Sequence, residues 1–137
     1  MMKFPWHSDK AKTAGRNYTS SATVDSLVMP GVKFVIAKMS FGRRMDLMLR
    51  VRELARRAEF LAASASPGDK MDAALMQAEI ERLYVMWGIQ SVAGLTVDSR
   101  AAGAEALTEA GPEGLFREAL GAVRRETGLS EEERKNF

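Results

Sequence analysis

Few side chains in this sequence could perform covalent or metal chemistry. The 137 residues contain no cysteine and one histidine, His7, so a thiol nucleophile, a zinc ribbon and a histidine-based hydrolase triad lack their residues. Acidic pairs occur at Glu79 and Glu81 and in the run 131–133. On a helix, positions 79 and 81 point about 200° apart, and the later run suits the acidic first turn of a helix. The glycines form no phosphate-binding pattern, and we expect no enzyme, no metal and no cofactor.

A basic stripe is the strongest functional signal that the side chains offer. Arg43, Arg50 and Arg57 recur every seven residues, and such a stripe can bind phosphates. Asp46 and Glu53 stand four residues before Arg50 and Arg57, a spacing that favours ion pairs along a helix. Because the stripe is partly neutralised in this way, nucleic-acid binding is the less favoured interpretation, and it stays open as an alternative.

The charge is unevenly distributed along the chain. The net charge is +2, but residues 28–65 carry a net +5 and residues 66–137 a net −5. A basic middle followed by an acidic half either steers a charged partner or forms ion pairs between the two halves. Composition leaves both interpretations open.

Two long helices must position these side chains. The stretch 40–65 lacks proline, and its apolar residues recur at spacings of four and three, which predicts one buried face: Leu47, Val51, Leu54, Ala58 and Leu61. A second helix is predicted from about 67 to 86, with Ser66 as N-cap and Pro67 in the first turn. Gly88 is then expected to end that helix in a left-handed conformation. A short connection makes the two helices an antiparallel pair.

Strands and shorter helices complete the expected domain. Residues 23–38 predict a β-hairpin that turns at Pro30 and Gly31, and residues 92–98 predict a strand that pairs with it. Shorter helices are expected at 104–110 and 112–127, and another begins near Ser130. The predicted fold is therefore α+β and mostly helical: a small antiparallel sheet packed on a bundle of two long and two or three short helices.

One domain accounts for a chain of this length. Residues 1–22 are expected to form a loosely ordered basic arm, and residues 23–137 a single globular domain. The start of the chain lacks the apolar run of a secretory signal, and no stretch is apolar enough to span a membrane. These features predict a soluble, intracellular protein that does not enter the membrane.

The order of several segments resembles a known family. These are VMPGVKFVI, MSFGRRMDLMLRVRELARRAEFL, LYVMWGIQSVAGLTVD, GPEGLFREALGAVRRE and the ending GLSEEERKNF. The combination resembles the small tail assembly chaperones encoded by long-tailed bacteriophages and prophages. It covers about residues 28–137, and the first twenty or so residues have no counterpart in it.

The resemblance implies a non-enzymatic helper in the host bacterial cytoplasm. Such proteins coat the long, aggregation-prone tape measure protein and help tail tube subunits to polymerise around it. A virion component, such as a head–tail connector or tail completion protein, is the nearest alternative. A homo-oligomer is compatible with the sequence but not required by it. The residues expected to contact the partner are basic, methionine and aromatic side chains of the two long helices: Arg43, Met45, Met48, Arg50, Arg57, Phe60, Tyr84 and Trp87.

Overall fold

A three-stranded antiparallel sheet forms one end of the molecule. The computed structural model describes residues 15–128. In it β1 (Ser21–Asp25) pairs with β2 (Lys33–Ala37), and β3 (Ile89–Ala93) pairs with the other edge of β2. The predicted hairpin and its third strand are thus confirmed, although the third strand begins at Ile89, three residues earlier than expected. β1 begins within the stretch assigned to the arm, so the sheet starts two residues before the proposed boundary.

The hairpin turns where the sequence predicts it. The amide of Val32 donates to the carbonyl of Met29 over 3.0 Å, and Gly31 has φ +96°, as a type II turn requires at its third position. A second hydrogen bond, from the amide of Ser26 to the carbonyl of Val32 (2.8 Å), closes a wider loop around this turn. Leu27 and Val28 therefore leave the strand and stand exposed in the connection.

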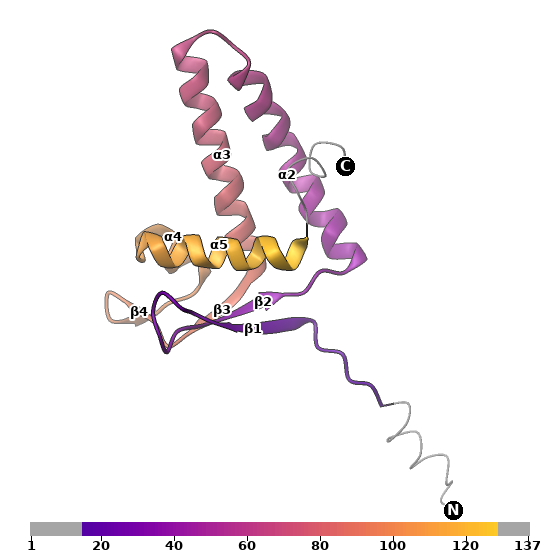
Figure 1. Ribbon diagram of the computed structural model, residues 1–137, viewed down its shortest axis with the longest axis vertical. Coiled ribbons are helices and arrows are strands. Elements are labelled where there is room, and N and C mark those ends of the chain that lie inside the picture. Colours follow the sequence, from indigo (N-terminus) through magenta and orange to yellow (C-terminus); the bar gives the residue numbers. More distant parts are fainter. Residues whose placement is uncertain (1–14, 129–137) are drawn as a thin grey trace, which may run out of the picture.

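Two long helices rise from the sheet as an antiparallel α-hairpin (Figure 1). They are α2 (Phe41–Ala62) and α3 (Pro67–Gly88). The Ser40 hydroxyl caps α2 by accepting from the amide of Arg43 (3.2 Å), and the Ser66 hydroxyl caps α3 by accepting from the amide of Asp69 (3.4 Å). The two caps fix the starts of the helices within a residue of their expected positions.

The end of α3 differs from the expected cap. Gly88 is the last helical residue and the chain passes directly into β3, with Ile89 extended at φ −87°. A Cβ added at Gly88 would lie 2.6 Å from Cγ1 of Val123. This position therefore carries glycine because α5 crosses it closely, and the prediction of a left-handed cap was wrong.

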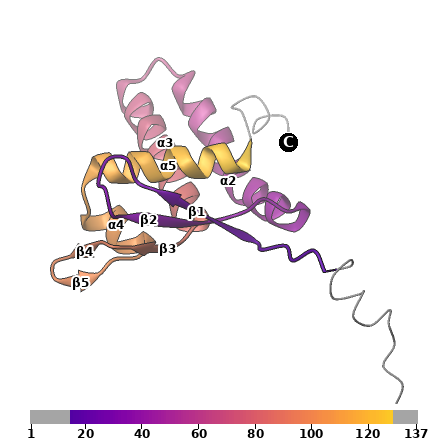
Figure 2. The same cartoon turned by 60° about the horizontal axis from the view of Figure 1, so that its bottom comes forward.

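The last third of the described chain folds over the foot of the α-hairpin. The short pair β4 (Thr96–Val97) and β5 (Arg100–Ala101) is followed by α4 (Ala104–Ala110) and α5 (Glu113–Thr127). α5 lies across the sheet and the base of α3 and contacts both (Figures 1 and 2). Gly128 ends α5 at φ +64°. The further helix expected near Ser130 lies outside the described residues, as does the arm up to residue 14.

The core lies where the sheet, the base of the α-hairpin and α5 meet. Its largest fully buried side chains come from all three: Phe34, Ile36, Leu47, Met48, Ile80, Tyr84, Leu107 and Leu115. Among the described residues, no buried side-chain nitrogen or oxygen lacks a hydrogen bond. The predicted class, α+β and mostly helical with a small antiparallel sheet, is confirmed.

Candidate binding surface on the long helices

An apolar stripe runs along the solvent side of α2. Phe41, Met45, Leu49 and Phe60 are exposed, the two phenylalanines at 82% and 78% of their surface and Leu49 at 65%. At about 100° per residue these positions share one side of the helix and span roughly 28 Å. That side points away from Leu47, Val51 and Ala58, which α2 buries, while the buried Met48 lies beside it, next to Phe41. Together with Arg52 and Arg56, the four apolar residues are called the outer face of α2 below.

Two arginines stand within this outer face. Arg52 and Arg56 are exposed, and within residues 15–128 neither forms an ion pair. Arg56 also lines a shallow hollow of about 340 Å³ with Arg57, Phe60 and Leu61. Near its C-terminal end, α2 thus presents the ring of Phe60 beside the guanidinium groups of Arg56 and Arg57. This combination suits a partner whose surface is apolar with acidic residues at its edge.

Three residues of the predicted site hold the fold together. The Arg43 guanidinium donates to the carbonyls of Ser20 and Lys38 over 2.8 and 2.9 Å. The Arg50 side chain binds the Asp46 carboxylate at 3.0 Å, and the indole of Trp87 donates to the same carboxylate at 3.1 Å. Arg43 therefore anchors the start of α2 to the strands, while Asp46 ties α2 to α3.

Two other predicted contact residues are buried. Met48 is 2% exposed and Tyr84 1% exposed, so neither can contact a partner in this conformation. Tyr84 belongs to the main core cluster, and the Arg124 guanidinium covers its ring at 5.7 Å. Their assignment as binding residues was wrong, because the fold covers both side chains.

Met45, Arg50, Arg57 and Phe60 of the predicted site are exposed, and Arg50 is paired with Asp46. The site prediction omitted Phe41, Leu49, Arg52 and Arg56, because it followed the seven-residue repeat of Arg43, Arg50 and Arg57. The signal that locates the outer face is a spacing of four from Phe41 through Leu49, which resumes from Arg56 to Phe60.

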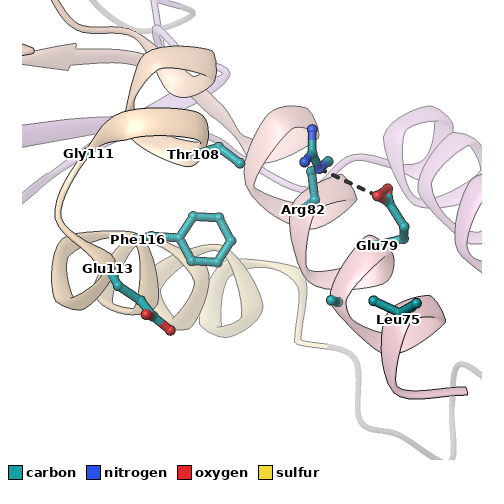
Figure 3. Close-up of a pocket in the computed structure, with 8 residues that line it drawn as sticks. Leu75, Glu79, Arg82, Thr108, Gly111, Glu113 and Phe116 are labelled. Atoms are coloured by element: carbon teal, nitrogen blue, oxygen red, sulfur yellow. Dashed lines mark ion pairs between the residues drawn. The ribbon is translucent and has the colours of Figure 1, made fainter. Parts of the chain in front are cut away.

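An acidic groove lies on the far side of α3, where α4 and α5 approach it (Figure 3). It encloses about 700 Å³, and its lining is contributed by all three helices: Leu75, Ala78, Glu79, Arg82, Thr108, Gly111, Glu113 and Phe116. Leu75 and Phe116 supply apolar surface, and the carboxylates of Glu79 and Glu113 stand at its edge. We call this feature the α3–α5 groove.

Ion pairs organise the rim of the groove. Arg82 pairs with Glu79 at 3.6 Å and with Glu109 of α4, while Arg117 pairs with Glu81 at 2.8 Å and with Glu113 at 3.5 Å. The hydrogen bond and the charge of Glu81 raise the pKa of Arg117. Four carboxylates thus meet two guanidinium groups beside the groove, and the charged residues that line it, Glu79, Glu113 and Arg82, leave one net negative charge.

The described residues offer no sign of a metal centre. Within 15–128 no three His, Cys, Asp or Glu side chains gather as metal ligands would. Glu79 and Glu81 pair with arginines of different helices, Arg82 and Arg117 respectively, so the two carboxylates do not converge on one point.

The chain matches no protein-family model, no curated protein and no solved structure. Among residues 15–128, no helix combines the length and apolarity needed to cross a membrane.

Proposed function

We propose that this chain is a non-enzymatic phage tail assembly chaperone, which binds helical segments of the tape measure protein on the outer face of α2 and so assists tail tube assembly. The observation that supports the proposal most directly is the exposure of Phe41, Leu49 and Phe60 along one side of a single helix. The partner is proposed to be the tape measure protein because residues 28–137 resemble the tail assembly chaperones.

The outer face has the composition that a helical partner needs. An amphipathic helix packs its apolar side against residues spaced at three and four. The outer face presents Phe41, Met45 and Leu49 at this spacing over about 12 Å, and Phe60 follows about 16 Å further along. Aromatic side chains are the usual anchors of protein interfaces. Arg52 and Arg56 add attraction for acidic residues beside the apolar side of the partner. A partner with many similar helical segments could therefore be bound at many places along its length.

Nucleic-acid binding draws less support from the geometry. Two of the three arginines of the seven-residue repeat, Arg43 and Arg50, are engaged by carbonyl and carboxylate oxygens of the chain itself. A phosphate would have to compete with these partners, whereas the outer face offers apolar surface that a phosphate backbone does not need.

Co-expression with the tape measure protein tests the proposal. The wild-type chain is expected to raise the soluble fraction of that protein and to co-purify with it after nuclease treatment and in high salt. The double variant Leu49→Ser/Phe60→Ser should lose most of this effect, because it removes exposed apolar area at the centre and end of the outer face.

The matched control is Leu27→Ser/Val28→Ser, which removes comparably exposed apolar residues from the loop between β1 and β2. It should behave as wild type. Equal losses in both double variants, or retention that salt or nuclease abolishes, would count against binding through the outer face. Finding the chain in purified, finished tails would instead support a virion component.

A further inference from the structure

The two exposed surfaces of the long helices complement each other. The outer face of α2 is apolar with two cations, Arg52 and Arg56, that lack ion pairs among the described residues, and the carboxylate of Glu59 lies on the same side, so the face has one net positive charge. The α3–α5 groove is apolar along Leu75, Ala78 and Phe116, and its charged lining residues, Glu79, Glu113 and Arg82, leave one net negative charge. The outer face of one copy therefore complements the α3–α5 groove of another copy in polarity and charge.

We propose that the outer face of α2 of one copy docks in the α3–α5 groove of a second copy. The α3 side of the groove runs from Leu75 to Arg82 over roughly 10 Å, close to the roughly 12 Å that Phe41, Met45 and Leu49 span on α2. In this arrangement Arg52 and Arg56 lie near the carboxylates of the groove rim, and Leu49 and Phe60 lose their exposed area to the second copy.

The alternative pairing of two outer faces is disfavoured by charge. Arg52 and Arg56 of one copy would then approach the same residues of the other, and like charges brought together across an interface oppose association. The groove offers carboxylates in their place, so the heterologous pairing both buries apolar area and matches charge.

Because the two surfaces are different, a copy whose groove holds the outer face of a second copy can still dock its own outer face in the groove of a third. Contacts of this head-to-tail kind form either closed rings or chains of indefinite length. Wild-type protein should therefore pass from monomer to species larger than dimer as its concentration rises. This association uses the same outer face as the proposed function, so the tape measure protein and a second copy would compete for it. The association does not require the tape measure protein, and its failure would leave the proposed function standing.

Sedimentation velocity of the full chain over a range of concentrations tests the pairing. Two variants each disable one surface: Leu49→Asp/Phe60→Asp on the outer face and Leu75→Asp/Ala78→Asp in the groove. All four positions are exposed, so both variants should fold, and circular dichroism checks that they do. Each variant alone should remain monomeric.

The mixture of the two variants gives the decisive result. The intact groove of the first variant should accept the intact outer face of the second, and the product should stop at a one-to-one dimer. Arg52→Glu/Arg56→Glu should weaken wild-type association by about tenfold or more, and Leu27→Asp/Val28→Asp should leave it unchanged. A wild-type chain that stays monomeric, or a mixture that forms no dimer, would overturn the proposal.

Discussion

α5 and the α-hairpin use apolar residues in opposite ways. On α5 the large apolar side chains lie on one side, and Leu115, Leu120 and Val123 are buried there. The long helices have apolar residues on two sides. Of the ten large apolar side chains exposed among the described residues, seven stand on α2 and α3: Phe41, Met45, Leu49, Phe60, Met71, Leu75 and Met86.

This difference separates residues that maintain the fold from residues available to a partner. A helix with one apolar side buries that side by packing it on the core, as α5 does. When a second apolar side remains exposed over several turns, the fold does not explain it, and contiguous exposed apolar surface commonly marks an interaction site. The α-hairpin therefore carries the outer face and one wall of the α3–α5 groove, while Glu113 and Phe116 of α5 form part of the opposite wall.

The largest expected difference comes from making the same leucine-to-alanine substitution on α5 and on α2. Leu115→Ala on α5 removes a fully buried side chain and should lower the free energy of unfolding by about 2–5 kcal/mol. Leu49→Ala on α2 removes an exposed one and should change it by less than about 0.5 kcal/mol. Chemical denaturation of both variants measures the difference, and similar losses in the two would contradict the division proposed above.

Glycine substitutions test how tightly α5 closes on the α-hairpin. Gly88→Ala places a Cβ against Val123, which is fully buried, and overpacking of this kind should destabilise the protein by about 1–2 kcal/mol. Gly42→Ala, in the first turn of α2, meets nothing within 4 Å and should stabilise by up to about 1 kcal/mol. Thermal unfolding of the two variants should shift in opposite directions, and a Gly88→Ala protein as stable as wild type would show that α5 packs more loosely.

A smaller effect is expected where α5 fastens the loop between β1 and β2. The Glu118 carboxylate accepts hydrogen bonds from the hydroxyl of Ser26 (2.5 Å) and from the amides of Leu27 (2.6 Å) and Val28 (3.3 Å). Glu118→Gln weakens this acceptor and should lower the free energy of unfolding by about 1 kcal/mol at neutral pH.

The contribution of Glu118 should also depend on pH. Burial, the largest single influence, raises the pKa of Glu118, but the hydrogen bonds from Ser26, Leu27 and Val28 together outweigh it, and the pKa lies below its ordinary value of 4.5. The charged form thus stabilises the fold above pH 4.5, and this stabilisation is lost as the pH falls through the lowered pKa. The Gln variant should lose less stability over that range, whereas Glu53→Gln, at an exposed position, should follow wild type.

Local signals predicted most of the elements, and tertiary contacts decided what they missed. Ser40, Ser66 and Pro67 mark helix starts through caps that involve only a few neighbouring residues, so the sequence sufficed there. The role of Gly88 depends on Val123, and the loop at Ser26 depends on Glu118, 92 residues away. No periodicity reveals such pairs.

The candidate site was harder to predict for a related reason. Helical spacing groups side chains into sides of a helix, but which side is buried depends on where the partner helix lies. Met48 and Tyr84 share helices with exposed residues and still belong to the core. The exposed apolar residues of such a helix can be recognised in the sequence only after its buried apolar residues have been assigned to the core.

The path of the chain has a consequence for the order of folding. About fifty residues separate β2 from β3, although the two strands are neighbours in the sheet. The α-hairpin fills this interval and brings the chain back beside β2. Once the two helices have paired, much less entropy is lost when β3 pairs with β2, because the loop between the strands is already closed. We expect the α-hairpin to form first, the sheet to close next, and α5 to settle last over Gly88.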